Sequence, residues 1–328
     1  MALTPIDETH ALQIQAGTLG RRAGHQFEDA ICARIASLEF PLTAQDGAER
    51  HVFVGDPATL LLECVIRHFG ETGLKSAIAI STGALATSET GKHWLQINGM
   101  EVRRCKSDIV LTLEFLSGTM RTVGISTKQC NNRSPTNAQL YFTTARGFAT
   151  LLRDNGLAVS DGAISALRQF CGDPGFRPLD DLKALANRSI DPRRFFWEEL
   201  PTVARAEWET LLHSRQDDIT KLLLQKAYFY DPFAPDFLIH KTKRSESWGD
   251  TEVAVYAIEE LVALSRAYQG FATSPYSVRK GSYRDPVGVS HLAPRFGIVQ
   301  MQRGGQAQHP YQLQFNLQAS YFYRLEQL

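Results

Sequence analysis

The sequence lacks the features that would assign it to several specialised classes of protein. Its 328 residues contain no uncharged apolar run of the ~18 residues that a membrane-spanning helix needs. The five cysteines are scattered, and no two are spaced as Cys-x-x-Cys, which argues against a disulfide framework and against a structural zinc site. The nine histidines form no His-Glu-x-x-His group, so zinc chemistry is not expected.

An imbalance of charge is absent as well. The 35 Lys and Arg residues balance 35 Asp and Glu residues, which excludes a strongly basic, histone-like binder and an acidic disordered chain. The segment MALTPIDETHALQ has no basic stretch followed by an apolar one, so we expect no secretory signal and a reducing, cytoplasmic location. Because we find no repeats and no long Gly/Ser linker, we expect a single elaborated domain over residues 1–328.

What the sequence does contain is an alternation of helix and strand signals. Helices are predicted over residues 9–38, 57–70, 135–154, 160–172 and 251–270, with a charged helical region over 178–226. Strands are predicted over 93–97 and 101–104 around an Asn98-Gly99 turn, over 108–115 and 120–128, and over 295–302 and 311–318. This pattern predicts an α/β (α+β) fold with a mixed central sheet flanked by helices, a helical insertion and a C-terminal β-hairpin.

The most informative stretch is SDIVLTLEFLSGTMRTVGISTK, residues 107–128. Its odd positions are largely apolar and its even positions largely polar, as in two half-buried strands. A three-residue turn at residues 117–119 would place Asp108 opposite Lys128 and Val110 opposite Ser126. The carboxylate, the hydroxyl and the ammonium group would then share one face at one end of the hairpin.

Such a group of side chains suits the hydrolysis of a phosphodiester bond. A carboxylate can hold Mg²⁺, which neutralises developing charge and lowers the pKa of a bound water. A neighbouring lysine can hold or deprotonate the attacking water. The alternative is an ordinary surface ion pair between Asp108 and Lys128 at the end of a hairpin.

The same residues resemble the motif of the PD-(D/E)xK nucleases, in which an Asp on one strand precedes (D/E)-x-K on the next. Ser107-Asp108 matches the first element, and Ser126-Thr127-Lys128 matches the second with Ser126 in place of the acid. Similar Ile-Ser-x-Lys elements occur in a subset of type II restriction endonucleases. A second Pro-Asp pair, at residues 235–236, has no such partner strand and is interpreted as the start of a structural strand.

The resemblance extends to an N-terminal helix, on which the family tends to carry a glutamate that points at the metal site. The segment GHQFEDAI contains Glu28, which lies beside the apolar stripe formed with Ile31 and Ile35. A carboxylate there costs free energy unless it is paired or bound to a metal. The alternative is a helix-flank carboxylate paired with Arg21 or Arg22.

The resemblance implies a restriction-endonuclease-like core over about residues 15–155, completed by later strands and a helix over 235–270. The helical insertion would span about 156–230, and a DNA-recognition region about 271–328. The implied function is Mg²⁺-dependent, sequence-specific cleavage of double-stranded DNA, leaving 5′-phosphate ends, by a homodimer of a prokaryotic restriction-modification system. A DNA repair or junction-resolving nuclease and a catalytically inactive DNA-binding module are the alternatives.

Within this resemblance each candidate catalytic residue has an expected role. Asp108 and Glu28 would be metal ligands, and Ser126 would support the metal site through its hydroxyl or its backbone carbonyl. Lys128 would position or activate the attacking water.

Candidate DNA contacts lie in polar and basic stretches that the neutral total charge conceals. Residues 119–155 contain five basic residues and one acidic residue, the local excess that a phosphate backbone attracts. The amides of the C-terminal hairpin alternate with apolar residues and suit base-edge contacts, although a solvent-exposed polar strand face explains them equally. The expected contacts are Gln129, Asn131, Asn132, Arg133, Ser134, Asn137, Arg279, Lys280, Arg284, Gln300, Gln302, Arg303, Gln312 and Gln314.

Overall fold

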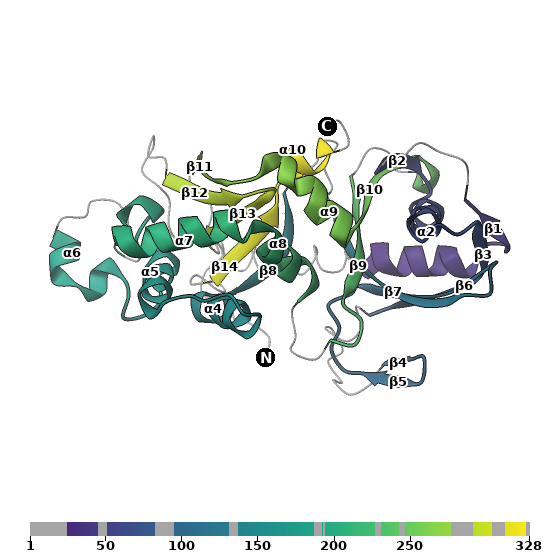
Figure 1. Ribbon diagram of the computed structural model, residues 1–328, viewed down its shortest axis with the longest axis horizontal. Helices are drawn as coiled ribbons and strands as arrows, with labels where there is room; N and C mark the ends of the chain where they lie inside the picture. Colours follow the sequence, from purple (N-terminus) through teal and green to yellow (C-terminus); the bar gives the residue numbers. More distant parts are fainter. Residues whose placement is uncertain are drawn as a thin grey trace, which may run out of the picture. The chain divides into compact units, whose positions relative to one another are not determined.

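The computed structural model of the chain divides into two compact units, which interleave along the sequence. It describes residues 25–44, 51–82, 95–130, 137–186, 192, 194–226, 231–242, 247–276, 291–303 and 312–325 (Figure 1). The seven-stranded unit comprises residues 20–138, 221–265 and 319–328. The five-stranded unit comprises residues 1–19, 139–220 and 266–318.

The seven-stranded unit is built on a mixed sheet of strand order β1-β3-β6-β7-β9-β10-β2. Its strands are β1 (Leu42–Thr43), β2 (Val52–Gly55), β3 (Gly73–Ser81), β6 (Ile109–Phe115), β7 (Met120–Gln129), β9 (Pro235–Lys241) and β10 (Thr251–Ala257). Neighbouring strands are antiparallel except β7 and β9, which run parallel. The start of β9 at Pro235 confirms that the second Pro-Asp pair opens a structural strand.

One face of this sheet is covered by two helices, the helix over residues 25–36 and α2 (Pro57–His68) (Figure 1). The odd-numbered residues of β6 are fully buried against them, as the alternation predicts. On the opposite face Val110 packs with Ile97 and Val102, from the hairpin of β4 (Leu95–Ile97) and β5 (Met100–Val102). Asn98 and Gly99 form its turn with φ of +51° and +75°, which confirms the predicted Asn-Gly hairpin.

The prediction of one long amphipathic helix over residues 251–270 is wrong. Residues 251–257 form β10, and α9 spans only Ile258–Ser265, followed by the short 3-10 turn η4 (Arg266–Tyr268). β10 pairs with β9 on one side and β2 on the other, so most of its side chains are buried on both faces. A strand buried on both faces is a continuous apolar run, and periodicity cannot distinguish such a run from a buried helix.

The five-stranded unit contains an antiparallel sheet of order β11-β12-β13-β14-β8. Its strands are β8 (Ala138–Thr144), β11 (Phe271–Tyr276), β12 (His291–Phe296), β13 (Val299–Arg303) and β14 (Gln312–Leu317). Its helical elements include α4 (Ala145–Asp154), α5 (Asp161–Cys171), η1 (Pro178–Asp180), α6 (Leu182–Ala186), η2 (Trp197–Glu199) and α7 (Thr202–Ser214). The remaining elements are α8 (Gln216–Gln225), η3 (Trp248–Asp250) and α10 (Ala319–Phe322).

The helix predicted over residues 135–154 begins ten residues later than expected, because residues 138–144 form β8. The segment AQLYFTT is rich in β-branched and aromatic residues, and Ala138 and Leu140 are buried at a spacing of two. Thr144 then caps α4 by accepting a hydrogen bond from the N–H of Gly147 at 3.0 Å. The expected cap, Ser134, lies outside the described residues.

The predicted fold class, mixed α/β with a central sheet flanked by helices, is confirmed by this strand order. The C-terminal β-hairpin is present as β13 and β14. Across the described segments, none of the helices has the length and apolarity required to traverse a lipid bilayer.

Candidate active site

The turn between β6 and β7 sets the register of the candidate site. The N–H of Phe115 donates to the carbonyl of Thr119 at 2.9 Å, and Gly118 has a φ of +88°. A three-residue hairpin loop consists of a type I turn followed by a left-handed residue, and glycine adopts that conformation most readily. The loop is therefore residues 116–118, one position earlier than predicted.

The predicted pairing of Asp108 with Lys128 is accordingly wrong by two residues. Glu114 pairs with Met120, and Ile109 pairs with Ile125. Asp108 follows at the end of this ladder, where its N–H donates to the carbonyl of Ile125 at 2.8 Å. A shift of two residues preserves the face of each side chain, so the expected carboxylate, hydroxyl and ammonium groups still meet.

Three donors converge on one oxygen of Asp108. Its Oδ2 atom accepts hydrogen bonds from Thr127 N at 2.7 Å, from Ser126 Oγ at 3.2 Å and from Lys128 Nζ at 3.4 Å. None of these three hydrogen bonds involves the other carboxylate oxygen, Oδ1. The Asp108 and Lys128 side chains are 29% and 19% exposed, so a ligand can reach this face.

Lys128 also donates hydrogen bonds to two groups on its own strand. Its ammonium group donates to Ser126 Oγ at 3.0 Å and to the carbonyl of Thr127 at 2.7 Å. On the neighbouring parallel strand, Lys128 is in register with the buried His240. Burial and the positive charge of Lys128 lower the pKa of His240 to about 4, so this imidazole is neutral at pH 7.

Glu28 reaches the site through Thr127, a residue that the sequence analysis did not single out. The Thr127 hydroxyl donates to Glu28 Oε1 at 3.1 Å, and His25 Nδ1 lies 3.1 Å from Glu28 Oε2. Glu28 is buried, and burial together with the negative charge of Asp108 raises its pKa. Because alternate side chains of a strand face opposite sides, Thr127 faces the helix that carries Glu28 while Ser126 faces Asp108.

A second lysine, also missed in the sequence, lies close to this group. Burial and the positive charge of Lys128 lower the pKa of Lys106 to about 8, while Asp108 and Asp231 oppose that shift. The N–H of Lys106 donates to Asp231 Oδ2 at 2.7 Å. Lys106 lies in the irregular segment that precedes β6, so no strand periodicity in the sequence singles it out.

Gly124 allows the segments that precede β6 and β9 to pack closely against β7. A Cβ atom at this position would collide with the Ser107 hydroxyl and the Ala234 carbonyl. The Ser107 hydroxyl in turn donates to the carbonyl of Phe233 at 2.6 Å. Asp236 accepts a hydrogen bond from the N–H of Gly124 at 2.8 Å. These contacts fix the backbone immediately next to Asp108.

The carboxylates of this site fit a magnesium ion better than a transition metal. The described residues hold no group of three or more His, Cys, Asp and Glu side chains that could share a metal. Asp108 and Glu28 do interact, because the negative charge of Asp108 contributes to the raised pKa of Glu28. Mg²⁺ is usually bound by one or two carboxylates, with water and substrate phosphate as its other ligands. Asp108 and Glu28 are oxygen ligands of that kind.

The candidate DNA contacts near β7 are only partly described. Gln129 is the last residue of β7 and pairs with Lys241, and Asn137 is exposed just before β8. The other expected contacts in the polar loop and in the basic loop after β11 lie outside the described residues: Asn131, Asn132, Arg133, Ser134, Arg279, Lys280 and Arg284.

The amides of the C-terminal hairpin share a face, but they bond to one another. Gln302 Nε2 donates to Gln300 Oε1 at 2.6 Å, and Asn316 Nδ2 donates to Gln302 Oε1 at 3.2 Å. Gln314 Nε2 donates to Gln139 Oε1 on β8 at 2.9 Å. Gln300 and Asn316 are buried, and the remaining expected contacts of this face, Gln302, Gln312 and Gln314, are half-buried.

Arg303 lies on the other face of β13 and is 5% exposed. Its guanidinium group lies 4.7 Å from the ring centroid of Phe196 and 5.4 Å from that of Phe170. The structure therefore places this arginine among aromatic rings, away from solvent.

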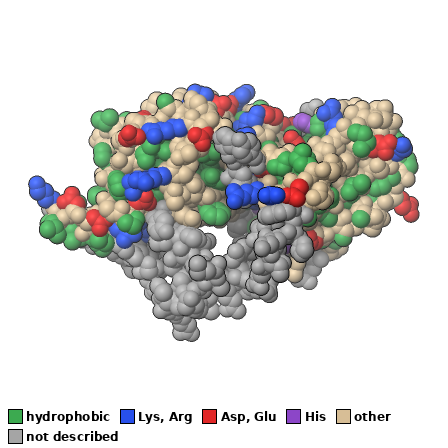
Figure 2. All heavy atoms as spheres, turned by 90° about the horizontal axis from the view of Figure 1, so that it is seen from below, with side chains coloured by type: hydrophobic (Ala, Val, Ile, Leu, Met, Phe, Trp, Pro, Cys, Tyr) green, Lys and Arg blue, Asp and Glu red, His purple; other side chains and the backbone are tan. Residues whose placement is uncertain are grey.

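The surface carries charges of both signs. Figure 2 shows Lys and Arg side chains interspersed with Asp, Glu and hydrophobic side chains on the face in view. This mixture agrees with the balanced composition of the chain. Local geometry around individual cationic groups is therefore more informative than total charge.

No family model matches the chain, and no curated protein matches it. Among solved structures it is similar to the crystal structure of the restriction endonuclease MspI in complex with its cognate DNA, with a TM-score of 0.41 and 13% sequence identity. The similarity covers 77% of this chain and 75% of that chain.

Proposed function

We propose that the chain is an endonuclease of the type II restriction kind, which hydrolyses double-stranded DNA at a specific sequence and depends on Mg²⁺. The observation that supports this proposal is the contact of Asp108, Ser126 and Lys128 on an accessible face, with the buried Glu28 behind them. Burial of an acid beside another acid is typical of functional sites, because it costs stability.

The ion pair of Lys75 and Glu114, on the same sheet, gives a comparison with an ordinary surface ion pair. Lys75 Nζ lies 2.6 Å from Glu114 Oε1, and the two side chains are 65% and 28% exposed. A third group, Ser76 Oγ, donates to Glu114 Oε2 at 3.3 Å. The Asp108 site differs because a buried glutamate adjoins it and because its lysine is one-fifth exposed.

Each residue of the site has a role in this proposal. Asp108 and Glu28 would hold Mg²⁺, which supplies neutralisation of phosphate charge and a bound water of lowered pKa. Lys128, oriented by Ser126, would donate a hydrogen bond to the attacking water or to a phosphate oxygen. The product ends would be 5′-phosphate, and cleavage of both strands at a palindromic site would require a homodimer.

The test is digestion of a plasmid of known sequence with Mg²⁺, with and without substitutions in β6 and in the residue that precedes it. Asp108→Asn removes a proposed metal ligand, and Glu114→Gln removes the carboxylate of the ordinary ion pair. We expect discrete fragments from the unmodified chain and from Glu114→Gln, and none from Asp108→Asn. Equal cleavage by both variants would contradict the proposal, as would the absence of cleavage by the unmodified chain.

The hydroxyl at position 126 favours a second candidate, a DNA-binding module without catalysis. With Ser126 in the acid position, the site holds one negative charge fewer than the (D/E)-x-K pattern provides. Duplex binding in a gel-shift assay, without cleavage in Mg²⁺ or Mn²⁺, would support this candidate. Cleavage of branched DNA alone would instead indicate a junction-resolving nuclease.

A further inference from the structure

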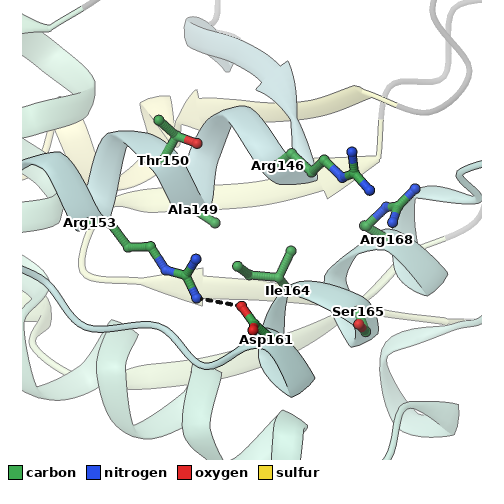
Figure 3. A pocket seen from close by; sticks show the side chains of 8 residues that line it. All are labelled: Arg146, Ala149, Thr150, Arg153, Asp161, Ile164, Ser165 and Arg168. Carbon is green, nitrogen blue, oxygen red and sulfur yellow. Dashed lines mark hydrogen bonds and ion pairs between the residues drawn. The ribbon is translucent and has the colours of Figure 1, made fainter.

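The five-stranded unit contains a polar cavity between α4 and α5. Its volume is about 340 Å³. Residues on one face of each helix line it, at helical spacings of three, four and seven (Figure 3). The polar members are Arg146, Thr150 and Arg153 from α4, and Asp161, Ser165 and Arg168 from α5.

The charges of this cavity do not balance. Three guanidinium groups and one carboxylate line it. Arg153 is already paired, because its Nη2 atom donates to Asp161 Oδ1 at 2.8 Å and its Nε atom donates to the carbonyl of Val159 at 3.0 Å. The excess positive charge therefore belongs to Arg146, because Arg168 forms an ion pair with Asp173 next to the cavity.

Arg168 is oriented before any ligand binds. Its Nε atom donates to Asp173 Oδ2 at 2.8 Å, and its guanidinium group lies 3.7 Å from the ring centroid of Phe176. Both side chains of this ion pair are largely buried, at 16% and 11% exposure. The Nη groups make no hydrogen bond with the described residues, so they remain available as donors.

Arg146 supplies the positive charge that no carboxylate neutralises. It forms no hydrogen bond or ion pair with the described part of the chain. In Figure 3 the guanidinium groups of Arg146 and Arg168 extend toward one another at one end of the cavity, while the Arg153–Asp161 pair lies at the other. The unneutralised charge of Arg146 would attract an anion to this end of the cavity, where the free Nη groups of Arg168 can also donate.

We propose that this cavity binds a phosphate group, carried either by a free nucleotide or by a nucleic-acid strand, between Arg146 and Arg168. Planar guanidinium groups match phosphate oxygens with paired hydrogen bonds. The Thr150 and Ser165 hydroxyls line the same cavity and can donate as well.

The cavity has room for more than the phosphate. Its volume is that of a small-molecule site, typically about 300–1,000 Å³. The side chains of Ala149 and Ile164 provide apolar contact for a sugar or base. This site lies entirely within the five-stranded unit and does not depend on the proposed cleavage reaction.

Binding to the full chain, measured by calorimetry for small ligands and by fluorescence anisotropy for a strand, tests this proposal. The probes are dAMP and a fluorescein-labelled 16-base-pair duplex without terminal phosphates, both in EDTA so that no strand is cut. The variant is Arg146→Gln, because this exposed side chain has no partner to lose in the described structure. The control is Arg215→Gln, which removes a half-exposed arginine paired with Asp218 in the same unit.

We expect Arg146→Gln to weaken binding by roughly 10-fold or more, since a charge-assisted hydrogen bond contributes about 1.5–3 kcal/mol. Arg215→Gln should keep the binding affinity within about twofold of that of the unmodified chain, as expected for loss of an exposed ion pair. Weakening of dAMP binding would identify a free nucleotide as the ligand, and weakening for the duplex alone would identify a strand phosphate. Binding of both probes unchanged by Arg146→Gln, or binding of neither probe to the unmodified chain, would overturn the proposal.

Discussion

The ammonium group of Lys128 lies 3.0 Å from the hydroxyl of Ser126, two residues earlier on the same face of β7. In the (D/E)-x-K pattern an acid would occupy this position. Here the hydroxyl bridges Lys128 and the Asp108 carboxylate, to which it also donates at 3.2 Å. Two neutral acceptors, this hydroxyl and the carbonyl of Thr127 at 2.7 Å, therefore lie closer to the lysine than the Asp108 carboxylate does.

Ser126→Ala should slow DNA cleavage with little loss of DNA binding. The substitution removes a donor to Asp108 and an acceptor for Lys128 but leaves both charges in place. We expect the single-turnover cleavage rate to fall by about 10- to 100-fold, the effect of one hydrogen bond to a charged group. Ser126→Asp, which restores the acid of the pattern, should retain activity.

A matched control for this substitution exists on the same sheet. Ser76→Ala removes a hydroxyl that donates to the carboxylate of Glu114 at 3.3 Å, away from the candidate site. It should cleave at the unmodified rate. If Ser126→Ala cleaves as fast as Ser76→Ala, the hydroxyl has no part in catalysis.

Glu28→Gln should stabilise the chain when divalent ions are absent. Burial and the charge of Asp108 raise the pKa of Glu28, so its ionised form opposes folding at pH 7. An acid with a raised folded pKa destabilises the native state increasingly as pH rises from about 4.5 through that pKa. A glutamine can still accept the hydrogen bond from Thr127.

The same variant should lose its response to Mg²⁺. Addition of Mg²⁺ should raise the melting temperature of the unmodified chain more than that of Glu28→Gln, because a ligand that binds only the native state stabilises it. Asp29→Asn, an exposed neighbour on the same helix, serves as the control and should respond like the unmodified chain. Equal Mg²⁺ responses of all three proteins would show that Glu28 is not a ligand.

Asp56→Ala should destabilise the seven-stranded unit by about 2 kcal/mol, the upper range for loss of a helix cap. Asp56 accepts hydrogen bonds from the N–H groups of Ala58 and Thr59, from Arg34 Nε at 2.6 Å and from Trp248 Nε1 at 2.9 Å. Urea denaturation at pH 7 measures this loss. Asp56→Asn keeps the capping acceptor and should lose less; equal losses would assign the effect to the Arg34 ion pair alone.

Asp56 should also make stability depend on pH. Although burial alone would raise its pKa, the hydrogen bonds from Arg34, Trp248 and the two N–H groups hold that pKa below 3.8. A carboxyl with a lowered folded pKa contributes full stability above its unfolded value, and this contribution is lost as pH falls through the folded one.

Local signals predicted α2 correctly because they act within a few residues. Asp56 caps the helix and Pro57 occupies its first turn, and both effects depend only on neighbouring backbone groups. The same holds for α5, which Ser160 caps and Gly172 ends with a φ of +76°.

The elements that the sequence did not predict owe their conformation to pairing with strands distant in the sequence. The segments that became β8 and β10 each carry enough apolar residues for a helix face, and only their strand neighbours in the sheets determine their conformation. The register of the site was missed because Gly118 occupies the third loop position instead of the second. The prediction that Asp108, Ser126 and Lys128 share a face was nevertheless correct, because a shift of two residues leaves each side chain on the same face of the sheet.

His240 should make the chain less stable in mild acid. It is 1% exposed, its Nδ1 atom lies 2.5 Å from the Tyr323 hydroxyl, and its Nε2 atom has no partner among the described residues. Burial and the charge of Lys128 lower its pKa from 6.5 to about 4, so folding favours the neutral imidazole. This contribution is fully present above pH 6.5 and is lost as pH falls toward 4, with a slope of up to about 1.4 kcal/mol per pH unit.

Urea denaturation at pH 7.0, 6.0 and 5.0 measures this slope in the unmodified chain and in His240→Asn. The asparagine amide retains a polar atom near Nδ1 but does not titrate, so the variant should be less stable at pH 7 and lose less stability on acidification. His213→Asn, at an exposed position on α7, is the control and should keep the unmodified slope. Parallel curves for the unmodified chain and His240→Asn would show that this histidine does not oppose protonation, and that Lys128 does not act on it across β7 and β9.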